Sequence, residues 1–207
     1  MALRYQKYSN RLFIGIYVAC LLCVIVLLTA CRQQPVPRPD GYFRIDAYPD
    51  VWRTDTLGGI SLQVNDSSRS VVQPDATEGV MWCNVVYPRY NATIYLSYIP
   101  VADKGELASL LAESRDLVYR QSVGTAAVTA VEYEDASRPL YAILYRLSAG
   151  SATPLQFVAT DSLRYLLRGA LYYDVMPLRI DSVAPTLEYM EADMARMIES
   201  ILPVENR

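Results

Sequence analysis

The chain has 207 residues, a length that predicts one domain or at most two small ones. It carries 19 basic and 22 acidic residues, and a formal charge of −3 offers no broad basic footprint for nucleic acid. Histidine is absent, which excludes Ser-His and Cys-His nucleophile pairs and imidazole zinc sites. Hydrophobic residues make up 52% of the chain, enough to build a core and to exclude a disordered protein.

The first 30 residues have the layout of a secretory signal. Three basic residues precede an uncharged run from Leu12 to Ala30, which ends in Leu28-Thr29-Ala30-Cys31. That ending fits the lipobox of bacterial lipoproteins. We therefore expect residues 1–30 to be removed as a signal peptide and Cys31 to carry a diacylglycerol on its sulfur and an N-acyl chain such as palmitate. The run is also long enough to span a bilayer, so an uncleaved membrane helix is the alternative.

Processing changes what the mature chain offers. Removal of the three basic residues leaves 16 basic against 22 acidic residues, a charge of −6. Cys83 is then the single cysteine without a lipid, and we expect it to be a buried structural thiol. Residues 31–40 contain Pro35, Pro37 and Pro39 and predict a stiff tether. The absence of acidic residues between Cys31 and Asp40 is similar to lipoproteins that face the periplasm.

Residues 41–203 predict a single α+β domain. The strands are expected from alternating or β-branched runs bounded by turn residues: Tyr42–Ala47, Ile60–Val64, Val80–Tyr87, Ala92–Ile99, Ala126–Tyr133, Leu140–Leu147, Leu155–Thr160 and Tyr165–Tyr173. The third and fourth read as a hairpin, and the last four as an antiparallel meander.

Two amphipathic helices are expected. The first runs from Asp103 to about Gln121, with Asp103 and Glu106 forming a capping box. The second runs from about Ala184 to Ile201, capped by Asp181 or Ser182, with an apolar stripe rich in methionine. The sum is an antiparallel sheet covered by two helices. The order of elements is similar to that of the PsbP-like α/β/α sandwich, a likeness of fold that carries no function.

The sequence contains no motif that carries catalysis. Gly58-Gly59 is not followed by the residues of a P-loop, and no nucleophile elbow is present. Two carboxylate clusters, at 132–135 and 188–193, could in principle run glycoside hydrolysis or hold a cation, but charged residues at helical spacing are typical of a solvated face. We therefore expect no enzyme activity, no metal site and no cofactor beyond the lipid.

Three Asp-Ser or Asp-Thr pairs precede an aliphatic residue, and these resemble the O-glycosylation sequon of exported Bacteroidota proteins. They would place sugars on Thr56, Ser162 and Ser182. Asp-Ser pairs also form turns and helix caps, which is an equally good explanation.

Seven stretches, in the same order, resemble the gliding motility lipoprotein GldD family of the Bacteroidota. They are Pro37–Ile45, Trp82–Pro88, Ala92–Tyr98, Glu113–Arg115, Gln156–Ser162, Leu167–Tyr173 and Asp181–Pro185. The segment 47–79 and the C-terminal residues 202–207 resemble the family least. The resemblance implies a non-enzymatic envelope lipoprotein that takes part in gliding and is tied to the type IX secretion machinery.

Polar and aromatic residues within or beside these stretches are the candidate partner-binding residues, because arginine and large aromatics dominate interface energetics. They are Arg44, Trp82, Tyr98, Arg115, Gln156 and Arg168. The alternative is that the aromatics lie in the core and the arginines pair internally. The expected partners are other envelope proteins of the same machinery, with the membrane contacted through the lipid. A rival function is binding of a lipid or glycan ligand in a cleft, and a third is carboxylate-based hydrolysis.

Overall fold

The computed structural model describes residues 21–22, 45–74, 79–122, 127–147, 151–174 and 180–204, with only the backbone described at 74 and over 180–184. The chain divides into two compact units, 1–41 and 42–207, and the fold below is that of the second. Cys31 and the predicted signal, apart from Leu21 and Leu22, lie outside the described residues. Among the described helices, none is long and apolar enough to cross a membrane.

The larger of two antiparallel sheets has seven strands in the order β3-β4-β5-β9-β8-β7-β6. Their bounds are β3 Arg69–Pro74, β4 Met81–Tyr87, β5 Ala92–Pro100, β6 Val128–Asp135, β7 Leu140–Leu147, β8 Leu155–Thr160 and β9 Tyr165–Tyr173. β4 and β5 form the expected hairpin through the single 3-10 turn η1, Pro88–Tyr90. β6 to β9 form the expected meander, which joins the hairpin through the β5–β9 pairing.

A smaller sheet is formed by β1 (Trp52–Leu57), β2 (Ile60–Asn65) and the short β10 (Leu202–Pro203). β1 and β2 are joined by Gly58-Gly59. Gly58 has φ +60°, and the Tyr98 ring would lie only 2.4 Å from a Cβ added there. Glycine is therefore required at this turn both by its backbone angle and by its contact with the larger sheet.

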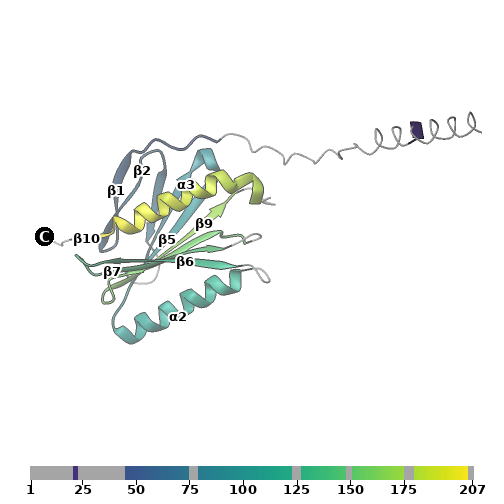
Figure 1. The fold of residues 1–207 in the computed structure, drawn as a ribbon. Helices are drawn as coiled ribbons and strands as arrows, with labels where there is room; N and C mark the ends of the chain where they lie inside the picture. Colours follow the sequence, from purple (N-terminus) through teal and green to yellow (C-terminus); the bar gives the residue numbers. More distant parts are fainter. Residues whose placement is uncertain are drawn as a thin grey trace, which may run out of the picture. The chain divides into compact units, whose positions relative to one another are not determined.

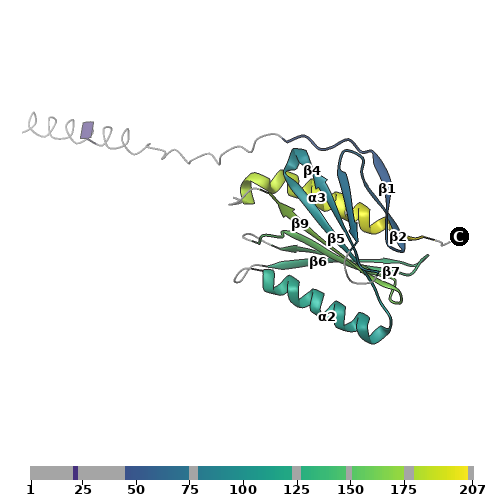
Figure 2. The same ribbon diagram turned by 180° about the vertical axis from the view of Figure 1, so that it is seen from behind.

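The two long helices cover opposite faces of the larger sheet. Figure 1 shows α2 (Lys104–Gln121) on one side and α3 (Ile180–Glu199) on the other, and Figure 2 shows the same layers from behind. Asp103 caps α2 by accepting hydrogen bonds from the backbone N–H groups of Gly105 and Glu106, as the sequence predicts. The expected class, an α+β fold with an antiparallel sheet covered by two helices, is confirmed, and its layers are those of an α/β/α sandwich.

The main core lies between α3, the smaller sheet and one face of the larger sheet. Met190, Met194 and Met197 of α3 are fully buried there, so the methionine stripe packs in the core. Cys83 is also buried and free, and burial followed by the nearby Asp55 charge raises the pKa of its thiol to about 11. The expectation of a buried cysteine is thus confirmed.

Several expected boundaries differ from the structure. The strand predicted over 42–47 is not formed by residues 45–47, which have no regular structure, and β1 and β3 were not predicted. Asp181 and Ser182 do not precede the last helix, because α3 already includes Ile180.

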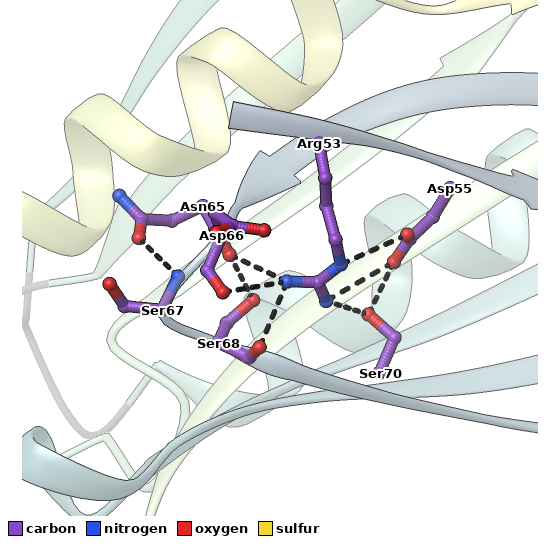
Figure 3. A network of polar contacts seen from close by, with 7 residues as sticks. All are labelled: Arg53, Asp55, Asn65, Asp66, Ser67, Ser68 and Ser70. Carbon is purple, nitrogen blue, oxygen red and sulfur yellow. Dashed lines mark hydrogen bonds and ion pairs between the residues drawn. The ribbon is translucent and has the colours of Figure 1, made fainter. Parts of the chain in front are cut away.

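A polar network on Arg53 joins the smaller sheet to β3 (Figure 3). The Arg53 guanidinium in β1 donates to the backbone carbonyls of Asn65 and Ser68 at 2.9 Å each, within and just after β2. It also donates to Ser70 Oγ of β3 at 2.7 Å and to the Asp55 carboxylate at 3.1 Å. Ser70 in turn donates to Asp55. One arginine side chain therefore forms hydrogen bonds with carbonyl groups of the turn that connects the two sheets and with Ser70 of β3.

Residues 45–49 are bound to the domain by tyrosine hydroxyls, and we call these contacts the tyrosine clasp. Tyr90 donates to the carbonyl of Asp46 at 3.2 Å and accepts from the Tyr48 N–H at 2.9 Å. Tyr189 of α3 donates to the carbonyl of Ile45 at 3.4 Å. The segment that follows the predicted tether is therefore held against η1 and α3.

Candidate functional site

An exposed aromatic surface lies on the face of the larger sheet that also carries α2. Its members are Val71 of β3, Trp82 of β4, Tyr95 of β5 and Tyr172 of β9, which are 38%, 51%, 42% and 36% exposed. The strand register places all four on the same face, because Asn84 of that face pairs with both Val71 and Tyr95. We call these four residues the open sheet face.

The position of α2 explains why this surface stays open. α2 packs its apolar side on β7, β8 and β9, where Tyr145, Val158 and Leu166 are buried. The part of the same face formed by β3, β4 and β5 lies beyond that contact. The four residues of the open sheet face therefore keep a third to a half of their surface exposed among the described residues. Large aromatics are seldom left in a contiguous exposed patch without a binding role.

A cavity of about 530 Å³ opens beside the open sheet face, between the C-terminal half of α2 and strands β5, β8 and β9. Leu117 and Val118 of α2 form an apolar wall, while Ser97, Gln121, Gln156 and Arg168 supply polar groups. Tyr95 and Tyr172 line it as well, with their rings edge to face at a centroid separation of 5.3 Å. The volume is within the usual range for small-ligand sites.

Three side chains at one side of the cavity are fixed by hydrogen bonds. The Gln121 Oε1 atom accepts from Thr153 Oγ1 and from Gln156 Nε2, at 2.6 Å each. Gln156 Nε2 also donates to Thr153 Oγ1 at 2.8 Å, which uses both of its protons. The amide nitrogen of Gln121 and the amide oxygen of Gln156 make no hydrogen bond to any other described residue.

Arg168 lies on the same row of the sheet as Trp82, because Ser97 of β5 pairs with both residues. Its Nη2 atom donates to the Leu110 carbonyl and to the Glu113 carboxylate of α2, at 3.3 Å each. Its Nε atom is buried and has no hydrogen-bonding partner among the described residues. A buried donor without a partner is costly, which marks this guanidinium as a place where a ligand oxygen would be stabilised.

The structure brings three of the six candidate partner-binding residues together. Trp82 lies on the open sheet face, and Gln156 and Arg168 line the adjoining cavity. Arg115 is exposed on α2.

Tyr98 does not belong to this site. Tyr98 is part of the core, with 8% of its surface exposed. Side chains alternate between the two faces of β5, and Tyr98 is on the core side, where its ring stacks on that of Tyr165 at a centroid separation of 5.7 Å. It therefore belongs to the interior rather than to a surface. Arg44 lies outside the described residues.

Sequence reasoning missed Val71, Tyr95, Tyr172 and Gln121. The alternation in β5 separates Tyr95 and Ser97 from the apolar residues of that strand, so it carried a signal that Tyr95 faces away from the main core. Val71 had no such signal, because β3 itself was not predicted.

The carboxylates offer little sign of a catalytic pair. Within the described residues, no three acidic or cysteine side chains cluster as metal ligands would. Burial raises the pKa of Asp193 to about 6, with a further contribution from the Asp50 charge. Glycoside hydrolysis needs two carboxyls with separated roles. Asp50 lines the same pocket as Asp193, but the volume of this pocket, about 210 Å³, is below the usual range for a ligand site.

The three predicted O-glycosylation residues are placed as follows. Thr56 is exposed on β1, and Ser182 lies in α3, where its side chain is not described. Ser162 has φ +66° in a turn where Asp161 accepts hydrogen bonds from the backbone N–H groups of Leu163 and Arg164. Asp161 thus has the turn role that was the alternative explanation, and glycosylation stays a prediction.

The domain thus presents an open aromatic face beside a polar-lined cavity. Comparison with protein families gives the particular class: the model of the gliding motility lipoprotein GldD family matches residues 32–202. The chain belongs to this family. Membership implies a lipoprotein of the cell envelope with a role in gliding motility.

Two further comparisons complete the picture. No curated protein matches the chain. Among solved structures, the solution structure of cyanobacterial PsbP (CyanoP) from Synechocystis is similar with a TM-score of 0.45 and 14% identity, covering 81% of this chain and 99% of that one.

Proposed function

We propose that the mature protein is a non-enzymatic assembly component of the gliding motility and type IX secretion apparatus, and that it binds another envelope protein through the open sheet face. In this proposal Cys31 carries the lipid and the domain faces the periplasm. The observation that carries it is the exposure of Trp82, 51%, in a patch with Val71, Tyr95 and Tyr172.

The composition of this face suits a protein partner. Tryptophan and tyrosine are the residues most often found at the energetic centre of interfaces, where they are buried by the partner. β3 also forms one edge of the larger sheet. A partner on the open sheet face would therefore meet aromatic rings next to an edge strand. The complete absence of histidine from the sequence supports a role without acid–base catalysis.

The experiment compares Trp82→Ala with Tyr119→Ala, which also removes a large exposed aromatic side chain, at a 56% exposed tyrosine on α2 outside the open sheet face. Both lipidated proteins are expressed in the native host, and secretion, gliding where it occurs, and binding of the purified envelope partner are measured. Loss of an interface anchor costs about 2 kcal/mol or more, so W82A is expected to bind roughly 30-fold more weakly. Equal affinity for W82A and wild type, with both folded, would contradict the proposal.

Ligand binding is a second candidate function, favoured by the 530 Å³ cavity with its fixed amides and the unpartnered Arg168 Nε. The two functions share Tyr95 and Tyr172, but Trp82 does not line the cavity, so a substitution at Trp82 distinguishes them.

A further inference from the structure

The polar groups of the cavity restrict what can occupy it. An acyl chain placed between α2 and the sheet would bury the Gln121 amide and the Ser97 hydroxyl without partners, and it would leave the already buried Arg168 Nε unpaired. Each buried polar group left unpaired costs about 1–3 kcal/mol, which opposes a lipid chain.

The charges around the cavity disfavour an anion as well. The Arg168 guanidinium is already paired with Glu113 at 3.3 Å. Asp174, a further carboxylate, also lines the cavity and is exposed. An anionic ligand would have to displace Glu113 and approach Asp174, so a neutral polar ligand fits better.

The aromatic and amide groups complete the pattern. Tyr95 and Tyr172 offer ring surface against which an apolar sugar face can pack. Within the part of the chain that the structure describes, the Gln121 amide nitrogen and the Gln156 amide oxygen have no partner, and they can pair respectively with a carbonyl and an N–H group of the same ligand amide. A ligand with a pyranose ring and an acetamido group carries both kinds of partner.

We propose that this cavity binds an N-acetylated sugar of a glycan, with the acetamido group on the Gln121–Gln156 pair and the sugar ring against Tyr172. The inference rests on the ligand-binding function given above as the second candidate. It does not depend on protein docking at Trp82, which lies outside the cavity, although Tyr172 belongs to both surfaces.

The probe is chitotriose, a trimer of N-acetylglucosamine, and cellotriose is the matched sugar without acetamido groups. Binding to the full lipidated chain in detergent micelles is measured by calorimetry and by saturation-transfer NMR. The expected result is saturable binding of chitotriose that is at least about tenfold tighter than that of cellotriose. Equal binding of the two sugars, or no saturable binding of chitotriose up to about 10 mM, would overturn the inference.

Two variants test the placement. Gln121→Glu keeps an oxygen acceptor for Thr153 and Gln156 but removes the amide donors, and it is expected to weaken chitotriose binding about tenfold. Gln73→Glu makes the same change at an exposed position of β3 outside the cavity and should leave the affinity unchanged. Equal effects of the two variants would overturn the assignment.

The aromatic contact is tested separately. Tyr172→Ala is expected to weaken binding roughly three- to tenfold, the value of one packed ring. Tyr141→Ala, at a 45% exposed tyrosine of β7 outside this cavity, is the control and should have no effect. Preference for decanoate over both sugars would overturn the sugar class while leaving a ligand-binding function in place.

Discussion

Asp193 is held in surroundings that disfavour its charged form. It lies on α3 in a pocket that includes Tyr48, Tyr90, Tyr189 and Asp50. Burial is the main cause that raises the pKa of its carboxyl from 3.8 to about 6, and repulsion from Asp50 adds to it. The buried Tyr87 hydroxyl opposes the rise, but it has no partner at hydrogen-bonding geometry among the described residues and so acts as a nearby dipole.

The direction of the resulting pH dependence follows from linkage. The folded state holds the Asp193 proton more tightly than the unfolded state, so this group's contribution to the free energy of unfolding falls as pH rises from about 4 to about 6 and is constant above.

Replacing Asp193 with Asn removes the free-energy cost of holding an ionised carboxylate in this buried position. We expect D193N to raise the free energy of unfolding at pH 7.5 by roughly 1–2 kcal/mol, discounted for partial exposure, and to leave it unchanged below pH 4. Urea unfolding at several pH values measures it, with Glu188→Gln on the exposed face of α3 as the control. A D193N variant whose gain is the same at every pH would show that the charge is not responsible.

Between elements, the Arg53 network supplies a connection that apolar packing does not. β1 and β3 are in different sheets, and Arg53 is the side chain that binds the β2–β3 turn and Ser70 at the same time. A guanidinium can do this because its five N–H groups point in fixed directions, whereas a lysine ammonium cannot span the same acceptors.

Loss of this arginine should therefore cost more than loss of a surface ion pair. We expect Arg53→Ala to lower the free energy of unfolding by about 2–3 kcal/mol and Arg53→Lys to recover less than half of that. Arg120→Ala, which removes an exposed pair with Asp116 at 3.9 Å, should cost less than about 0.5 kcal/mol. Equal costs for the two alanine variants in urea unfolding would contradict the assigned role of Arg53.

The elements that the sequence predicts best are those in which the pattern of apolar residues along the element matches the burial of that element in the structure. β7, β8 and β9 have the expected bounds because they lie inside the sheet and are almost continuously apolar. β1 and β3 were missed because their residues include Arg53, Asp55 and Arg69. Those two strands are stabilised partly by a network whose members are distant in sequence, and a local pattern does not contain it.

The candidate site could be predicted only in part for a similar reason. The apolar stripe of α2 shows that the helix packs on a sheet, but it does not say which strands the helix covers. The packing of α2 on β7, β8 and β9 leaves Trp82 exposed and places Arg168 and Gln156 in one cavity. Their sequence positions alone gave no reason to place these two residues together.

For the whole molecule, the tyrosine clasp and the open sheet face lie on different sides of the larger sheet. The clasp binds residues 45–49 to η1 and α3, while the open sheet face is on the side of α2. The clasped segment, residues 45–49, therefore does not occupy the open sheet face.

The most direct test of this account is site-specific photo-crosslinking in living cells. A photoreactive amino acid replaces Trp82 on the open sheet face, and in a second strain it replaces Tyr119 on α2. The account predicts a discrete adduct with an envelope protein of the gliding and secretion apparatus from position 82 and none from position 119. Adducts of equal yield from both positions, or no adduct from position 82 while the protein is folded and lipidated, would contradict it.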